Sequence, residues 1–132
     1  MLEKELEKKF VEAVKKAGGK AYKFTSPGSV GVPDRLVVFP ENKIGFVELK
    51  TEKGKLTAYQ KKQLNDLIDK GCCVCLLNNP NLIQPVIELI QRGAPWSFAE
   101  QTQVAKHHII RYGKTKVSDR EDALSEGKPW PL

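Results

Sequence analysis

Hydrophobic residues recur every three or four positions near the start of the chain, a spacing typical of one face of an amphipathic helix. Between residues 2 and 17 this face carries Leu2, Leu6, Phe10, Ala13, Val14 and Ala17. Gly18 and Gly19 follow at once, and glycine commonly ends a helix. The pattern therefore predicts a helix over residues 2–17.

Short apolar segments separated by turn residues follow this helix. Residues 20–25 alternate as a short strand does, and residues 26–33 are rich in glycine, proline and serine. Two further apolar segments, residues 34–39 and 44–50, have only four residues between them. So short a connection predicts an antiparallel hairpin. A turn near residues 41–42 would set Asp34 opposite about Leu49.

The pattern then returns to helix, strand and helix. Residues 58–70 predict a helix closed by Gly71, residues 72–77 an apolar strand, and residues 82–91 a third helix. The strand holds all three cysteines, which we interpret as small buried hydrophobic residues because the four-ligand spacing of a zinc site is missing. This order predicts an α/β (α+β) fold, a mixed sheet flanked by helices, whose last strand is placed to run parallel to a neighbour.

The chain after Gly93 has a different character. Ala94-Pro95-Trp96 interrupts the pattern, and the spacing of a helix capping box occurs at residues 97–100 and again at residues 118–121. Two further helices are expected near residues 98–112 and 119–126. We therefore divide the chain into a core, residues 1–92, and a C-terminal helical extension of the same domain, residues 93–132.

The overall composition is that of one soluble globular domain, with 132 residues, 40% hydrophobic and 29% charged. No segment is long and apolar enough to span a membrane, and the charged start has no signal-peptide core, so a cytoplasmic location is expected. The net charge of +6 suits a polyanionic partner such as nucleic acid, but it is also found in ordinary basic proteins.

Three charged residues interrupt the apolar segments of the predicted hairpin. Glu48 and Lys50 continue the strand face of Phe46, because side chains two residues apart share a face. The hairpin brings Asp34 beside both of them. Two neighbouring carboxylates repel one another, and a hard divalent cation relieves that repulsion while activating water for phosphoryl transfer. The alternative is a structural ion pair between Lys50 and one of the carboxylates.

These residues resemble a known nuclease signature. Pro33-Asp34, followed by Glu48-Leu49-Lys50, is similar to the PD-(D/E)xK signature, although so short a pattern also occurs by chance. A longer and more specific string in one order resembles the VRR-NUC branch of that superfamily, over roughly residues 3–90. Its segments are Ser26-Pro27-Gly28, Gly31-Val32-Pro33-Asp34-Arg35, Phe46-Val47-Glu48-Leu49-Lys50, Gly54-Lys55-Leu56 and Gln60.

The resemblance implies a restriction-endonuclease-like fold and an endodeoxyribonuclease that depends on Mg²⁺ or Mn²⁺. Asp34 and Glu48 would be metal ligands, the backbone carbonyl of Leu49 a further ligand, and Lys50 the catalytic lysine. Stand-alone members occur in phages and bacteria and resemble Holliday-junction resolvases, which implies a homodimer acting on branched DNA such as four-way junctions. A non-cleaving DNA-binding module on the same fold and a structural subunit that works through its C-terminal helices are the alternatives.

Two supporting residues are also implied by the resemblance, because the family supplies an acidic residue from the first helix and a glutamine beside the site. Glu7 lies at the edge of the apolar stripe, where a carboxylate is costly unless it is paired or binds a cation, so we favour it over Glu3. A partly solvated helix edge is the alternative. Gln60 matches the family's glutamine and also ends a predicted capping box that begins at Thr57.

Basic and polar residues around these positions are expected to contact the phosphate backbone of DNA. A solvated charged face is the ordinary explanation for any single lysine among them. The predicted DNA-binding residues are Lys23, Ser26, Arg35, Lys53, Lys55 and Lys61.

Overall fold

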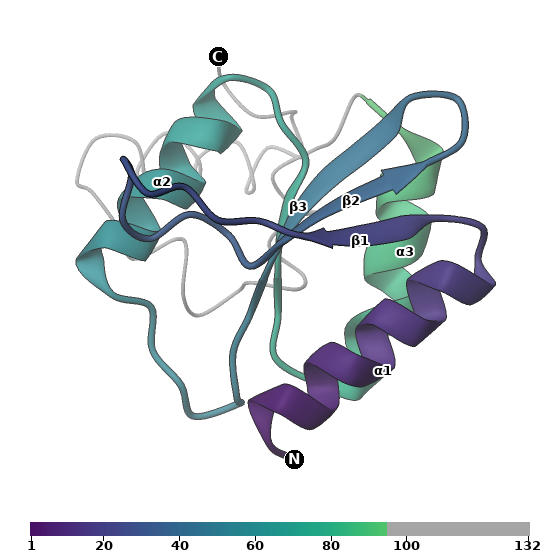
Figure 1. Cartoon of the computed structure of the whole chain (residues 1–132), viewed down its shortest axis with the longest axis horizontal. Coiled ribbons are helices and arrows are strands. Elements are labelled where there is room, and N and C mark those ends of the chain that lie inside the picture. Colours follow the sequence, from purple (N-terminus) through teal and green to yellow (C-terminus); the bar gives the residue numbers. More distant parts are fainter. Residues whose placement is uncertain (95–132) are drawn as a thin grey trace, which may run out of the picture.

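The computed structural model describes residues 1–94, which contain three α-helices and a four-stranded sheet (Figure 1). The element order predicted from the sequence is confirmed. No helix in this part of the chain is long and apolar enough to cross a membrane. The helices predicted near residues 98–112 and 119–126 lie outside the described residues. The elements are α1 (Glu3–Lys16), β1 (Lys20–Lys23), β2 (Arg35–Phe39), β3 (Lys43–Leu49), α2 (Ala58–Asp69), β4 (Val74–Leu77), the 3₁₀ turn η1 (Pro80–Leu82) and α3 (Ile83–Arg92).

The four strands lie in the order β1-β2-β3-β4. β1 and β3 each pair with β2 in antiparallel fashion, whereas β4 pairs with β3 in parallel. A parallel neighbour needs a crossover connection, and α2 lies in that connection between β3 and β4. The sheet is therefore mixed, as predicted, and its parallel strand is the last one.

The β2–β3 hairpin is paired one residue away from the predicted register. Arg35 pairs with Val47, so Asp34, one residue earlier, lies opposite Glu48 rather than Leu49. The prediction was wrong because the hairpin has a three-residue loop, two residues of which adopt the left-handed backbone with φ of 66° and 61°. The association of the two carboxylates survives the shift, because directly opposed residues have neighbouring side chains.

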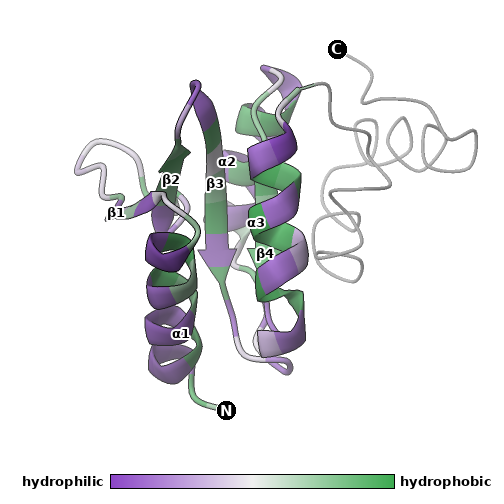
Figure 2. Ribbon diagram, turned by 90° about the vertical axis from the view of Figure 1, so that its right-hand side faces the viewer, coloured by the Kyte–Doolittle hydropathy of each residue, from purple (hydrophilic) through white to green (hydrophobic). Residues whose placement is uncertain are grey.

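Helices cover both faces of the sheet, with α1 and α3 on one side and α2 on the other (Figures 1 and 2). Each face has its own core because strand side chains alternate between the two sides. The core under α1 and α3 includes Leu6, Phe10, Val37, Val47, Leu49, Val86, Ile87 and Ile90. The core under α2 comprises Leu56, Leu64, Ile68, Val74 and Leu76.

The cysteine-containing strand β4 is buried along its whole length. Cys73 and Cys75 are buried, Cys72 is half-buried, and all three are free thiols. Cys73 and Cys75 pack into the core under α1 and α3. The interpretation of these two cysteines as small buried hydrophobic residues is confirmed.

Candidate active site

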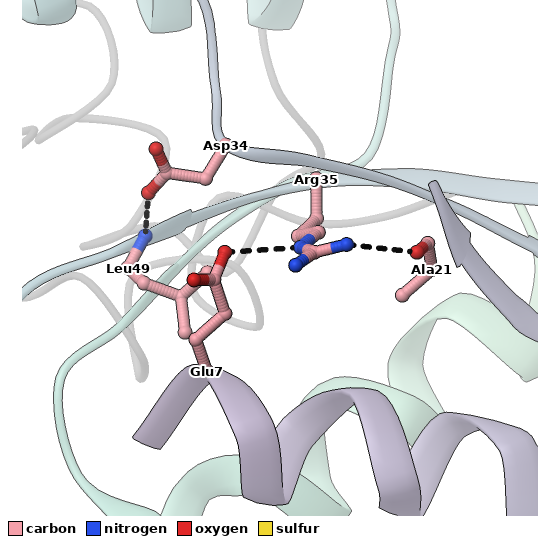
Figure 3. Close-up of polar contacts among 5 residues, drawn as sticks. All are labelled: Glu7, Ala21, Asp34, Arg35 and Leu49. Atoms are coloured by element: carbon pink, nitrogen blue, oxygen red, sulfur yellow. Dashed lines mark hydrogen bonds and ion pairs between the residues drawn. The ribbon is translucent and has the colours of Figure 1, made fainter. Parts of the chain in front are cut away.

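The carboxylates of Asp34 and Glu48 lie next to each other at the end of the β2–β3 hairpin that is opposite its turn. Glu48 is the penultimate residue of β3 and is only 1% exposed. Asp34 precedes β2, and its Oδ2 accepts a hydrogen bond of 2.9 Å from the backbone N–H of Leu49 (Figure 3). That bond fixes the Asp34 carboxylate across the end of β3, beside Glu48.

The two oxygens of Glu48 are in different situations. Oε2 accepts a hydrogen bond of 3.2 Å from Nε2 of Gln60, the third residue of α2. Oε1 is buried and has no hydrogen-bond partner among residues 1–94. Most buried polar atoms in proteins have a partner, because an unsatisfied one costs free energy. The bare oxygen of Glu48 therefore requires an explanation.

Burial and mutual repulsion shift both carboxylates toward the protonated form. Burial first, and then the charge of Asp34, raise the pKa of Glu48 from 4.5 to about 8, and the charge of Lys50 and the nearby backbone N–H of Asp34 partly oppose this rise. Burial also raises the pKa of Asp34, opposed by the hydrogen bond from Leu49 and by the charge of Lys50. Within residues 1–94 Lys50 itself forms no ion pair. Its ammonium group thus acts on both carboxylates without being tied to either.

Gln60 is held in place by the start of α2. Its backbone N–H donates to Thr57 Oγ1 at 3.1 Å, and its Oε1 accepts from the Thr57 N–H at 2.9 Å, which completes the predicted capping box. The side chain then still has its Nε2 free to reach Glu48. One glutamine therefore caps a helix and contacts Glu48, and the catalytic role expected of Gln60 stays a prediction.

Gly31 brings the loop before Asp34 against the same helix start. It has a φ of +89°, and an added Cβ would lie 2.6 Å from the carbonyl carbon of Tyr59 and 2.7 Å from the backbone nitrogen of Gln60. Only glycine adopts this backbone without strain and leaves this room. The loop and α2 are thus packed backbone to backbone beside the site.

Glu7 and Arg35 form an ion pair on the α1 side of the sheet (Figure 3). Arg35 Nε donates to Glu7 Oε2 at 3.0 Å, and its NH1 group donates to the carbonyl of Ala21 at 3.1 Å. Arg35 follows Asp34 in the chain, so alternation along the strand turns their side chains to opposite faces. The pair links α1 to β1 and β2 next to the carboxylates, and the charge of Glu7 still raises the pKa of Asp34.

Comparison with known proteins identifies the family. The family model for the VRR-NUC domain matches residues 1–79 of the 132. The chain belongs to the VRR-NUC domain family. It is 48% identical over 80 residues, 61% of this chain and 86% of the relative, to "Putative nuclease p44" of Acyrthosiphon pisum secondary endosymbiont phage 1. A solved VRR-NUC domain superposes with a TM-score of 0.62 at 29% identity, covering 65% of this chain and 94% of that domain.

The VRR-NUC site fits a divalent cation with few protein ligands. Mg²⁺ typically takes one or two carboxylates and keeps several waters, and Glu48, next to Asp34, supplies a buried Oε1 that has no hydrogen-bond partner among residues 1–94. Within residues 1–94 no group of three or more His, Cys, Asp or Glu is close enough to hold a metal. The side chains thus offer a two-carboxylate site, and the predicted ligand roles of Glu7 and the Leu49 carbonyl stay predictions.

The predicted DNA-binding residues of this VRR-NUC domain differ in how exposed they are. Lys23 is exposed at the end of β1, and Ser26 is half-buried in the following loop. Lys53 and Lys55 are exposed between β3 and α2, and Lys61 is half-buried in α2. Their contact with DNA stays a prediction.

Sequence reasoning missed what Arg35 does inside the VRR-NUC domain. Its side chain is 17% exposed and bound to Glu7, and the DNA contact expected of it stays a prediction. The signal was present, because a residue adjacent to Asp34 in a strand must face the opposite side, where the first helix carries its half-buried acidic residue. The sequence analysis treated Glu7 as a candidate metal ligand and Arg35 as a candidate phosphate contact, so the pair was not considered.

Proposed function

We propose that this VRR-NUC protein is a metal-dependent endodeoxyribonuclease that hydrolyses phosphodiester bonds, with a preference for branched DNA such as four-way junctions. The observation that supports this most is the buried Oε1 of Glu48, which has no hydrogen-bond partner among residues 1–94 although the carboxylate of Asp34 is close enough to raise the pKa of Glu48. A protein that only holds DNA gains nothing from such an arrangement, which costs stability in the absence of a cation.

Asp34 and Glu48 would hold the ion, which we take to be Mg²⁺ or Mn²⁺. When bound, such an ion lowers the pKa of water and offsets the negative charge that develops on a phosphate under attack. The hydrogen bonds from Leu49 to Asp34 and from Gln60 to Glu48 hold one oxygen of each carboxylate. Both side chains are therefore oriented before any substrate arrives.

Lys50 is proposed as the catalytic lysine. Its charge reaches both carboxylates, and within residues 1–94 it forms no ion pair, so its ammonium group is available to a water molecule or a phosphate oxygen. It would orient the water whose oxygen attacks phosphorus in line with the departing sugar oxygen. It would also stabilise the charge on the non-bridging oxygens, a role suited to a fixed cation.

The preference for branched DNA rests on the family resemblance and on charge. The net charge of +6 and the exposed lysines at positions 23, 53 and 55 suit a substrate that surrounds the site with phosphates. A homodimer is proposed because a two-fold assembly matches the near-symmetry of a four-way junction. Its two sites would cut two strands of the same substrate.

The test is cleavage of labelled DNA in EDTA, Mg²⁺ and Mn²⁺. Four-way junction, flap, single strand and linear duplex of matched sequence are compared side by side. Wild type is measured with Lys50→Ala, and with Lys16→Ala, which removes an equal charge at the far end of α1. We expect metal-dependent cutting that is fastest on the junction, a loss of about 10²–10³-fold in Lys50→Ala, and wild-type rates in Lys16→Ala.

Each departure from this result has a definite meaning. Cutting of linear duplex as fast as junction would remove the proposed branch preference but keep the nuclease. Binding of DNA without cutting in either metal would overturn the enzyme proposal in favour of a non-cleaving module.

A further inference from the structure

We propose that a pocket just beyond the ends of β3 and β4 takes an unstacked nucleobase of the DNA strand next to the phosphate under attack. The proposal rests on the proposed nuclease function and names the substrate feature that its site would recognise. It concerns the pocket of about 480 Å³ that we call the β3–β4 pocket, lined by Leu6, Thr51, Glu52, Lys53, Asn78 and Pro80 among others.

The pocket begins where the two parallel strands end. β3 and β4 run side by side to Leu49 and Leu77, and the backbone N–H of Lys50 donates to the Leu77 carbonyl at 3.0 Å. The next residue of each chain segment, Thr51 after β3 and Asn78 after β4, lines the pocket. Crevices beyond the carboxyl ends of parallel strands are common ligand sites in α/β proteins. The pocket therefore starts one residue away from the proposed catalytic lysine.

The lining suits a flat, neutral, polar-edged ring. Leu6 and Pro80 provide apolar surface, and Thr51 and Asn78 provide hydrogen-bonding groups. None of the hydrogen bonds within residues 1–94 uses the side-chain amide of Asn78, which is half-buried. A free amide in a pocket that also offers apolar surface can pair with the polar edge of a nucleobase, as asparagine does in DNA recognition.

A carboxylate in the pocket wall argues against an anion as its occupant. Glu52 lines the pocket together with Lys53 and the N-terminal residue Met1, so the lining holds charges of both signs. Glu52 Oε1 accepts from Nδ2 of Asn79 at 2.8 Å, and Oδ1 of Asn79 accepts from the backbone N–H of Asn81 at 2.8 Å. Both polar groups of the Asn79 side chain are therefore already hydrogen-bonded in the pocket wall. The Glu52 carboxylate, which Asn79 holds there, would repel a phosphate. The base occupies the pocket, and Lys53 is left to meet the phosphate backbone at its rim.

A base can enter this pocket only after it leaves the helical stack, because neighbouring bases cover both of its faces in a duplex. Leaving the stack is least costly where pairing is already interrupted. The pocket would therefore favour DNA with an unpaired or weakly stacked nucleotide beside the cut over an uninterrupted duplex. Branch points, flaps and single strands share this property.

The test measures binding rather than cutting, so that it is independent of the proposed catalysis. The intact protein is titrated, in Ca²⁺, into fluorescently labelled four-way junctions by anisotropy. One junction is intact, and in each of the others a single abasic site replaces one nucleotide, moved stepwise through the branch region. Wild type is compared with Asn78→Ala. The control is Asn81→Ala, an exposed asparagine that does not line the pocket.

We expect one abasic position to weaken wild-type binding by about tenfold, the scale of a lost base contact. Asn78→Ala should weaken binding to the intact junction. It should show little further loss at that abasic position, because the substitution and the missing base remove the same contact. Asn81→Ala should behave as wild type. Thr51→Val, which keeps the shape of the side chain and removes its hydroxyl, serves as a second pocket variant if Asn78→Ala does not fold.

Three results would overturn the proposal. The first is that wild type binds all abasic junctions equally well, and the second is that wild type does not bind DNA at all. The third is that one abasic position weakens binding by the same factor in wild type, Asn78→Ala and Thr51→Val. A wild type that shows the expected abasic pattern in Ca²⁺ but does not cut in Mg²⁺ or Mn²⁺ would keep the pocket and overturn only the proposed nuclease reaction.

Discussion

Replacing Glu48 by glutamine should stabilise the metal-free protein although it removes a residue proposed to be essential for cleavage. Glutamine has the shape of a protonated glutamate, and its amide oxygen can still accept the hydrogen bond from Gln60 Nε2. The substitution therefore isolates one change, the loss of a buried ionisable group that is 1% exposed. Its effect on folding should depend on pH in a defined way.

The sign follows from proton uptake. Because the pKa of Glu48 is about 8 when folded and 4.5 in its ordinary state, the folded protein holds an extra proton between these values. The stability of wild type should therefore fall as pH rises from about 4.5 to about 8, and change no further from this group above that. At ~1.4 kcal/mol for each pKa unit, ionisation of Glu48 lowers the free energy of unfolding of wild type at pH 7 by about 3 kcal/mol relative to its value at pH 4.

The assay is thermal unfolding in EDTA at pH 4, 7 and 9. We expect equal melting temperatures at pH 4 and an advantage for Glu48→Gln of roughly 10 °C at pH 7, since ~1 kcal/mol shifts a domain of this size by a few degrees. Saturating Mn²⁺ or Mg²⁺ should stabilise wild type and leave the variant unchanged, which narrows or reverses the difference. Glu12→Gln, at an exposed position on α1, controls for the change in net charge.

The reasoning would be refuted if Glu48→Gln were no more stable than wild type at pH 7 and 9 in EDTA. It would also be refuted by an advantage that is the same size at pH 4. Either result would mean that the Glu48 carboxylate is not held at a cost in the metal-free protein, and the argument for a cation there would lose its basis.

Three further predictions concern the surroundings of the carboxylates. Gly31→Ala should lower stability by about 1–3 kcal/mol and slow cleavage, because its φ of +89° and the 2.6 Å approach to Tyr59 exclude a Cβ; wild-type melting and rates would contradict this. Glu7→Gln should cost about 1 kcal/mol by breaking the ion pair with Arg35 but keep the metal-induced rise in melting temperature, whereas loss of that rise would establish Glu7 as a ligand. Thr57→Ala and Gln60→Ala should each lose about 1 kcal/mol of helix capping, but only the second should also reduce the cleavage rate, because only Gln60 touches Glu48.

The fold was largely predictable because its information is local. The spacing of apolar residues in α1, the short hairpin connection and the capping box at Thr57 each determine a neighbouring stretch of backbone, and all three are present in the structure. The error in register came from the turn, because asparagine often adopts the left-handed backbone seen at Asn42 but glutamate rarely adopts the one seen at Glu41. The hydrophobic pattern alone therefore does not determine the register of the β2–β3 hairpin to within one residue.

The candidate site was predictable in its residues but not in its contacts. The alternation of β3 and the family resemblance together indicated Asp34 and Glu48. That Glu48 keeps one bare oxygen, and that Arg35 binds Glu7, depends on how α1 and α2 pack on opposite faces of the sheet. Such packing brings together residues that are 28 positions apart in the chain, and contacts of this kind cannot be predicted from the pattern of a single sequence.

The order of connections in the sheet has a consequence for how the chain folds. The β2–β3 hairpin is local in sequence and should form early, whereas the parallel pairing of β4 must wait for the α2 crossover. The hairpin thus brings Asp34 and Glu48 together while water still surrounds them. Glu48 loses that water only later, when α2 and β4 dock. In stopped-flow experiments without metal, raising the pH from 5 to 9 should therefore speed unfolding more than it slows the formation of the hairpin.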